Sequence, residues 1–293
     1  MTAHSASKNI TLIGVGLIGG SFVLDLKHKG LAGTVTGIDL NRSNLDRALE
    51  RKVIDRAFDH ICAEAVSGAD LVVIATPVAT LPAVCGELAS LLSGHTVITD
   101  VGSTKQSAID AFRQYLPQQL PRCIAAHPIA GSDRSGALAA QFGLFQNKKL
   151  IICPHGAEDS DGLCLVESLW QAVGAQTFRM SAREHDAVFA AVSHLPHLLA
   201  YAYVHQIATH PDGGVYFDFA ASGFRDFTRI ASSHPAIWAD ICMANKHSLL
   251  ALVNGQQQQL ATLKTMLEAG DAAALYRYFE EAKQARDDWA ALQ

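Results

Sequence analysis

Short hydrophobic runs alternate with longer amphipathic segments over the first 180 residues of the chain. The amphipathic segments include 43–52, 80–92 and 104–115, and each lies between two hydrophobic runs. Continuous runs rich in β-branched residues, separated by helices, predict a parallel sheet that helices cover on both faces. The strands are expected at 9–15, 34–39, 70–76, 96–101, 123–127, 149–154 and 176–180.

The pattern changes after residue 181, where no further strand is indicated. Residues 181–208 have the pattern of one long apolar helix, and 236–267 and 271–293 are helical as well. Their hydrophobic faces exceed what a small bundle buries within itself, so we expect them to form a dimer interface. The sequence therefore predicts an α/β domain over residues 1–180 and an all-α dimerisation domain over residues 181–293.

Composition narrows the class of protein. Of the 293 residues, 49% are hydrophobic and only 17% are charged, which indicates that much surface is buried against a partner subunit. The net charge is −5 and no run is rich in Lys and Arg, so we expect no nucleic-acid partner. No stretch long enough to cross a bilayer is free of charges and helix breakers, so we expect no membrane-spanning segment and no membrane partner. Six scattered cysteines without a CxxC pair favour reduced thiols and a cytoplasmic location.

The first predicted strand is followed at once by glycines in GxGxxG spacing, at Gly14, Gly16 and Gly19. A strand precedes the motif, a helix follows it, and Asp39 ends the second strand, which is typical of a Rossmann-type dinucleotide-binding domain. Asp39 would hold both ribose hydroxyls and favours NAD over NADP, although it could instead cap the next turn, and Arg42 lies nearby. The loop contacts expected for the cofactor are Gly14, Gly16, Leu17, Ile18 and Gly19.

Small polar residues also follow the later strands, at the edge where open α/β sheets bind ligands. Thr76 and Pro77 follow one strand, Asp100 and Ser103 lie at the end of the next, and His127 ends the strand after that. We expect Thr76, Pro77 and Asp100 to contact the cofactor, and Ser103 and His127 to face the same crevice. Two simpler interpretations stay open: Ser103 or the residue after it caps a helix, and His127 is only the polar edge of a buried strand.

The helical part carries its own candidates. His194 and His197 lie three residues apart on one helix face, a spacing that a metal could use, but no third ligand accompanies them and no metal is expected. His194 is equally open to a structural role and to a substrate contact. A buried Arg229 would need an anion, such as a substrate carboxylate, whereas Arg225 and Asp226 are expected to pair at the surface.

Five motifs follow one another along the chain: "GVGLIGGS", "DVGSTK", "HPIAGSDRSG", "SHLPH" and "GFRDFTRIASSHPAIW". In order and spacing they resemble the prephenate/arogenate dehydrogenases of tyrosine biosynthesis, over nearly the whole chain. The resemblance implies NAD-dependent oxidative decarboxylation of prephenate to 4-hydroxyphenylpyruvate, with arogenate open as a second substrate. It also implies a homodimer joined by the helical domain. From the length of this sequence we expect neither a fused chorismate mutase domain nor an ACT-type regulatory domain.

The same resemblance implies a role for each matching residue. His127 corresponds to the catalytic histidine that accepts a hydrogen bond from the ring hydroxyl, and Ser103 to the serine that positions this histidine and the nicotinamide. Arg229 corresponds to the arginine that binds a substrate carboxylate. Together with His194, the further substrate contacts expected are His197, Trp238 and Asp133.

Two other functions share parts of this pattern. A β-hydroxyacid dehydrogenase or a related NAD(P) enzyme has the same two-domain plan, but such enzymes usually place a catalytic lysine on the long helix after the first domain. Here that helix offers His194 and His197, and Lys246 lies well downstream. A non-catalytic dinucleotide-sensing dimer would need neither His127 nor Arg229.

Overall fold

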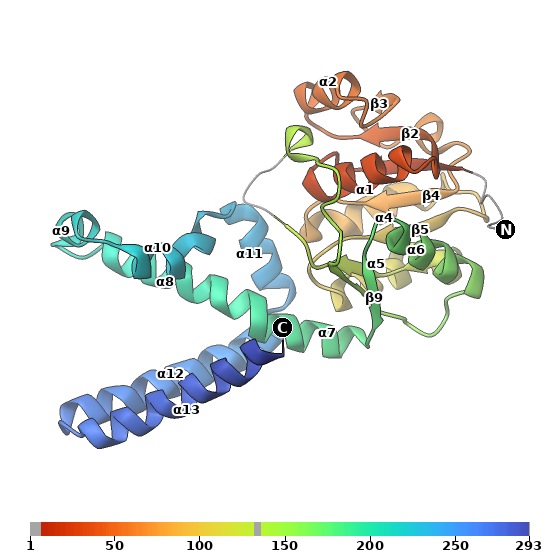
Figure 1. Cartoon of the computed structure of the whole chain (residues 1–293). Coiled ribbons are helices and arrows are strands. Elements are labelled where there is room, and N and C mark those ends of the chain that lie inside the picture. Colours follow the sequence, from red (N-terminus) through yellow and green to blue (C-terminus); the bar gives the residue numbers. More distant parts are fainter. Residues whose placement is uncertain (1–6, 132–135, 293) are drawn as a thin grey trace. The chain divides into compact units, whose positions relative to one another are not determined.

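The protein is described by a computed structural model that covers residues 7–131 and 136–292 (Figure 1). The chain forms two compact units, the first ending at Asn245 and the second starting at Lys246. The first unit contains both β-sheets and the helices up to residue 244, and the second consists of two helices. Residues 181–245 therefore belong to the same compact unit as the sheets.

Six parallel strands form the main sheet, in the order β3-β2-β1-β4-β5-β6. Most of their residues are hydrophobic and buried, as in a sheet covered on both faces. This strand order puts β1 beside β4, which opens a ligand crevice beyond the carboxyl ends of the strands and confirms the predicted Rossmann-type fold. The strands are β1 (Lys8–Ile13), β2 (Ala32–Ile38), β3 (Arg56–Phe58), β4 (Leu71–Ile74), β5 (Val97–Asp100) and β6 (Cys123–Ile124).

Two hydrophobic clusters cover the two faces of this sheet. On one face lie α1 (Leu17–His28), α2 (Arg42–Glu50) and α6 (Ser160–Ala172), where Phe22 stacks on Trp170 with ring centroids 4.1 Å apart. On the other lie α3 (Ala63–Val66), α4 (Leu81–Leu88) and α5 (Gln106–Tyr115). The short helices η1 (Val78–Thr80), η2 (Leu120–Arg122) and η3 (Ala137–Ala139) join these elements. Helices on both faces are what the alternation of runs predicts.

The region 123–127 is not one strand of a single parallel sheet, so this part of the sequence prediction is wrong. After β6 the chain leaves the main sheet at Ala125, whose carbonyl accepts a hydrogen bond from the Cys153 N–H at 2.9 Å. The next strand, β7 (Ala126–Pro128), pairs antiparallel with β8 (Lys149–Ile152), which pairs parallel with β9 (Gln176–Arg179) in a second sheet. His127 therefore lies in this second sheet.

Strand β3 is absent from the sequence prediction. It contains only three residues, one of them Arg56, and so short a segment shows no clear alternation of hydrophobic and polar residues.

The predicted single helix over 181–208 is a continuous helical run in three parts. α7 (Ala182–Phe189) leads into a π-helical turn, η4 (Ala190–His194), and then into α8 (Leu195–Ala208). Pro196 gives a physical reason for the interruption, because it has no N–H to complete the regular hydrogen-bonding pattern of an α-helix. The wider turn brings Ser193 and His194 to the cavity described below.

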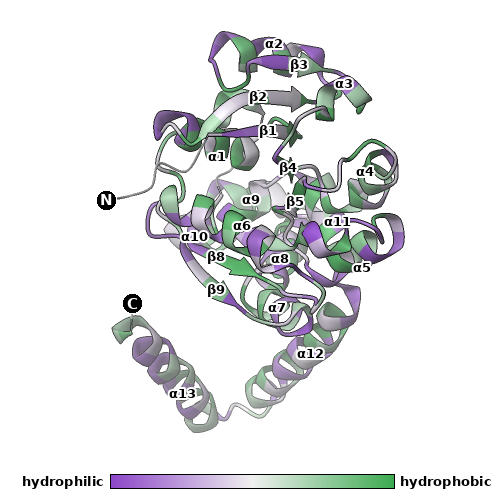
Figure 2. Cartoon of the chain, turned by 90° about the vertical axis from the view of Figure 1, so that its right-hand side faces the viewer, coloured by the Kyte–Doolittle hydropathy of each residue, from purple (hydrophilic) through white to green (hydrophobic). Residues whose placement is uncertain are grey.

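The rest of the first unit is helical, with α9 (Gly213–Asp218), α10 (Ser222–Thr228), η5 (Arg229–Ser232) and α11 (Pro235–Ala244). The helix predicted over 236–267 is interrupted at Asn245. The second unit holds α12 (Lys246–Glu268) and α13 (Ala272–Ala291). Asp271 is the N-cap of α13, and its side chain accepts a hydrogen bond from the Ala274 N–H. The Tyr278 hydroxyl donates to Gln259 across this pair at 2.8 Å. Figure 2 shows hydrophobic and hydrophilic residues mixed along both helices.

Candidate active site

The glycines after β1 form a cradle at the carboxyl edge of the main sheet. Gly14 has φ +89°, and a Cβ there would lie 2.6 Å from the Ala75 carbonyl oxygen, so only glycine fits. At Gly19 a Cβ would lie 2.5 Å from Leu12 Cδ1, which explains how closely α1 approaches β1. At Gly16 a Cβ would meet no atom within 4 Å, so the space above its backbone is open.

This open space lies at the amino end of α1, which starts at Leu17 with Gly16 as its N-cap. The backbone N–H of Gly20 donates to the Gly16 carbonyl, so the N–H groups of Leu17, Ile18 and Gly19 precede the first helical bond. Such N–H groups and the helix dipole attract an anion, and the backbone at Gly16 lets one approach closely. The loop therefore fits the pyrophosphate of a dinucleotide.

Asp39 follows β2, and its half-buried carboxylate is held against the glycine loop. One oxygen accepts hydrogen bonds from the Val15 N–H at 3.1 Å and from the Asn44 side chain at 2.9 Å, and the other accepts from the Asn41 N–H at 2.8 Å. Arg42, which could have favoured NADP, is exposed and pairs with Asp46 at 3.3 Å along α2. The carboxylate at this edge therefore meets no competing guanidinium from Arg42.

The three other expected cofactor contacts lie at the carboxyl ends of β4 and β5. Thr76 and Pro77 follow the end of β4, and the Thr76 hydroxyl accepts a hydrogen bond from Thr80 at 2.8 Å. Asp100 is only 2% exposed; it accepts from the Ala126 and Gly102 N–H groups and pairs with the buried Lys105 ammonium. With its oxygens used in this way, Asp100 supports the wall of the site, and its contact with the cofactor stays a prediction.

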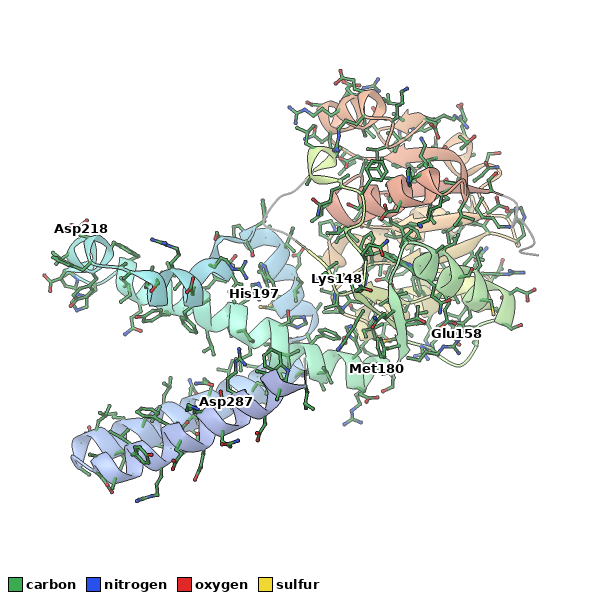
Figure 3. The ribbon with its side chains drawn as sticks, in the orientation of Figure 1. Lys148, Glu158, Met180, His197, Asp218 and Asp287 are labelled. Atoms are coloured by element: carbon green, nitrogen blue, oxygen red, sulfur yellow. The ribbon has the colours of Figure 1, made fainter. Side chains whose placement is uncertain are left out.

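A cavity of about 790 Å³ collects most of the predicted substrate and catalytic residues. This is a typical volume for a small-molecule site. Figure 3 labels one of its residues, His197, on α8. The predicted residues that line the cavity are Ser103, His127, His194, His197, Arg229 and Trp238. They come from the loop after β5, from β7, and from η4, α8, η5 and α11.

His197 and Trp238 form an aromatic wall, with ring centroids 3.4 Å apart and an interplanar angle of 17°. The His197 Nδ1–H donates to the Ser193 carbonyl at 2.9 Å, so its Nε2 carries the lone pair when the ring is neutral. Burial lowers the pKa of His197, and the charge of Arg229 lowers it further. His194 is buried at 1% exposure, and its Nδ1 accepts a hydrogen bond from the Asn245 amide at 3.2 Å.

Arg229 differs from its prediction in one respect, because its side chain is exposed and lines the cavity without being buried. Among the ion pairs of residues 7–131 and 136–292, none engages Arg229, Arg225 or Asp226, so the expected Arg225–Asp226 pair is not formed. A guanidinium at the cavity wall suits a carboxylate ligand. Asp133 lies outside the described residues.

His127 is half-buried in β7, and its surroundings keep the ring neutral. Burial, followed by the nearby positive charges of His185, Lys105 and His194, places the pKa of His127 well below its usual value. At neutral pH the ring therefore has a lone pair and can accept a proton.

Comparison with known proteins agrees with this arrangement. Residues 22–179 match the family model for the prephenate dehydrogenase nucleotide-binding domain, and residues 181–281 match that for the prephenate dehydrogenase dimerisation domain. A prephenate dehydrogenase of Bacillus subtilis is 40% identical over 95% of this chain and 75% of its own length. The chain belongs to the prephenate dehydrogenase family.

Two further members of this family are similar over nearly their whole length. A cyclohexadienyl dehydrogenase of Zymomonas mobilis is 32% identical over 95% of both chains. The crystal structure of prephenate dehydrogenase from A. aeolicus, in complex with hydroxyphenyl propionate and NAD⁺, superposes with a TM-score of 0.90 at 32% identity, covering 98% of this chain and 99% of the other. The recognition made from the five motifs is thus confirmed.

The prephenate dehydrogenase fold brings two residues to the site that the sequence analysis missed, His185 and Asp186. Both are buried in α7, and Asp186 accepts hydrogen bonds from the Lys105 and Gln106 N–H groups at 2.8 and 3.0 Å. The cap of α5 thus comes from Asp186, and neither Ser103 nor Thr104 supplies it. A polar His–Asp pair within an apolar helical pattern was the available signal.

The helical run Ala182–Ala208 is 27 residues long and, by length and composition alone, apolar enough to cross a membrane. Core helices of water-soluble proteins meet the same criterion. In this member of the prephenate dehydrogenase family the run contains Pro196 and lines the cavity, so it carries no argument for a membrane.

The buried His194 predicts how the stability of this family member depends on pH. Burial lowers the pKa of His194 to about 4, whereas an unfolded histidine titrates near 6.5. Between these values the unfolded chain binds the proton more tightly, so the free energy of unfolding should fall as the pH falls, by up to about 3 kcal/mol from this residue. Urea unfolding of the wild type and of His194→Gln, from neutral pH to about pH 5, measures this.

The expected result is a shallower pH dependence for His194→Gln than for the wild type. His60→Gln is the matched control, because His60 is exposed and pairs with the exposed Asp59, and it should keep the wild-type slope. Equal slopes for His194→Gln and the wild type would contradict the assignment.

Proposed function

We propose that the chain catalyses the NAD-dependent oxidative decarboxylation of prephenate to 4-hydroxyphenylpyruvate. The observation that carries this proposal is that one cavity is lined by a neutral histidine, His127, by Arg229, and by Ser103, which follows β5 at the sheet edge that also carries the glycine cradle. The substrate has matching groups, namely a ring hydroxyl that must lose a proton and carboxylates that need a cation. Membership of the prephenate dehydrogenase family supports the same reaction.

The residues of the chain orient the substrate and remove its proton. Arg229 would hold a substrate carboxylate by charge-assisted hydrogen bonds, and the stacked pair His197–Trp238 would confine the ring. Ser103 would position His127 and the nicotinamide, and His127 takes up the hydroxyl proton as the C4 hydride departs. The nicotinamide, when bound, supplies the hydride acceptor. Loss of CO₂ from C1 then restores aromaticity and makes the reaction effectively irreversible.

Asp39 and the glycine loop support NAD as the cofactor. The carboxylate that follows β2 would accept hydrogen bonds from both ribose hydroxyls and would repel a 2′-phosphate. Leu17, Ile18 and Gly19 would hold the pyrophosphate through their N–H groups, with Thr76 and Pro77 near the nicotinamide half of the crevice.

We further propose arogenate as a second substrate and a homodimer formed through the helical domain. We also propose a domain division between residues 180 and 181, which follows the boundary between the two family models, although the first compact unit of the structure extends to Asn245. The match to a dimerisation-domain family supports the dimer, and so do exposed hydrophobic side chains after residue 200. These include Tyr203, Val215, Phe217, Phe219, Phe227 and Met243. We also propose a cytoplasmic location, because all six cysteines are free thiols and three of them are buried.

A direct assay tests the function. NADH formation should follow the addition of prephenate with NAD⁺, with less or no activity when NADP⁺ replaces it. Arogenate is tested in parallel, and activity with both acids would support dual use. Absence of turnover with either acid, in protein shown to bind NAD⁺, would contradict the proposal and favour a dinucleotide-sensing role.

Replacing the proposed base tests its role. His127→Asn should lower kcat by at least about 10²-fold with little change in KM, because general-base catalysis is lost while binding is kept. His60→Asn, a change to an exposed histidine, is the control and should keep wild-type kinetics. Near-normal kcat in His127→Asn would remove His127 from the mechanism.

Arg229→Gln should instead raise KM for prephenate strongly, by roughly 10²-fold, because a charge-assisted pair to a carboxylate is lost. Arg225→Gln is a matched control, because Arg225 is an exposed arginine four positions earlier that does not line the cavity. An unchanged KM in Arg229→Gln would place this arginine in a structural role.

A further inference from the structure

Behind His127, on the side away from the substrate residues of the cavity, a chain of short polar contacts leads into α7. His127 Nδ1 lies 2.8 Å from His185 Nε2, and His185 Nδ1 lies 2.8 Å from an oxygen of Asp186. The His185 side chain is fully buried and that of Asp186 nearly so. His185 does not line the cavity, so it acts on the substrate only through His127.

The carboxylate at the end of this chain is an obligatory acceptor. Asp186 receives the N–H groups of Lys105 and Gln106 at the start of α5. Burial alone would raise the pKa of Asp186, but the hydrogen bonds from His185 and these N–H groups outweigh it, so its pKa is lowered. Asp186 is therefore ionised at neutral pH and has no proton to donate.

This acceptor determines every proton position up to the cavity. His185 must donate its Nδ1–H to Asp186, which leaves the lone pair of neutral His185 on Nε2. His127 Nδ1 faces this lone pair and must therefore carry a proton, and the lone pair of neutral His127 is then on Nε2. Because Nδ1 is engaged with His185, Nε2 is the nitrogen available to the cavity.

We propose that His185 and Asp186 are positioning residues that hold His127 in the Nδ1–H tautomer and take up the charge when His127 accepts the substrate proton. The proposal rests on His127 being the base. In the proposed step the substrate hydroxyl proton bonds to His127 Nε2, and the Nδ1 proton of His127 moves to His185 Nε2. The hydroxyl electron pair stays with the substrate as its hydride leaves, and the positive charge rests on His185 beside Asp186.

The groups around His127 agree with this path. Lys105, His194 and His185 all face it with positive or potentially positive charge, and Asp186 is the anion at the far end of the chain. The other buried carboxylate, Asp100, is held by Lys105. A charge left on His127 would be repelled by the nearby Lys105 ammonium, whereas a charge on His185 is hydrogen-bonded to Asp186, where the attraction is greatest.

Two replacements of His185 separate positioning from packing. His185→Phe keeps a ring but removes the acceptor, and should lower kcat by at least about 10-fold with KM changed by less than about twofold. His185→Gln keeps a carbonyl acceptor for the His127 Nδ1–H and should retain clearly more activity than His185→Phe. His155→Phe is the control, because the His155 side chain is also buried and bonds the backbone and Glu158, away from the cavity.

Nitrogen NMR of ¹⁵N-histidine-labelled enzyme reads the tautomer directly. Wild-type His127 should show a protonated Nδ1 and an unprotonated Nε2, and Asp186→Asn should weaken this preference, because the neutral amide oxygen that faces both the Lys105 N–H and His185 Nδ1 is a poorer acceptor than a carboxylate. Asp159→Asn controls for loss of a helix cap, because Asp159 accepts the Gly162 N–H at the start of α6, away from the site.

The outcomes distinguish this proposal from the proposed function. Equal kcat in His185→Phe, His185→Gln and the wild type, or a His127 Nε2–H tautomer in the wild type, would overturn the relay even if His127→Asn is inactive. Normal kcat in His127→Asn would instead overturn the base on which it rests. A loss of activity in His185→Phe accompanied by the same loss in His155→Phe would assign the effect to folding and overturn the positioning role.

Discussion

The carboxylate of Asp186 connects the three parts of the active site. This carboxylate accepts hydrogen bonds from the Lys105 and Gln106 N–H groups at the start of α5 and from the His185 ring. The backbone carbonyl of Asp186 accepts a hydrogen bond from the Asn245 side-chain amide at 2.7 Å. These contacts join α7, the amino end of α5 and the end of α11 at one point. Since Ser103 lies just before α5 and His127 touches His185, the positions of both depend on this carboxylate.

A buried ion pair supports the same region from the side of the sheet. Lys105 and Asp100 are both almost fully buried, and Lys105 also donates to the Ala126 carbonyl at 2.6 Å. Burial of two charges costs free energy that good geometry and additional hydrogen bonds must offset. Here Asp100 accepts additional hydrogen bonds from the N–H groups of Gly102 and of Ala126, the residue before His127. The ion pair therefore holds the backbone at the carboxyl ends of the strands, next to the proposed active site.

Histidines packed near one another and near Lys105 explain why the proposed base is neutral. Burial comes first among the causes that lower the pKa of His127, His185, His194 and His197. Neighbouring basic groups lower the pKa of all four histidines further, whereas Asp186 opposes the shift for His185 and His194. A cavity of this kind keeps His127 unprotonated, so that its lone pair is available, and leaves Arg229 as the cation for an anionic substrate. The division of roles between base and carboxylate binder thus follows from burial.

Much of the fold and of the site could be predicted from the sequence alone. The glycine spacing, Asp39 and the alternation of hydrophobic runs could be predicted because they depend on local backbone conformation. The five motifs identified five residues that line the cavity, namely Ser103, His127, His197, Arg229 and Trp238. Tertiary structure alone decided the change of sheet at Ala125, the structural role of Asp100, and the roles of His185 and Asp186. These depend on contacts between residues about 25 to 80 positions apart, such as Asp186 with Lys105, and no local pattern records a partner that distant.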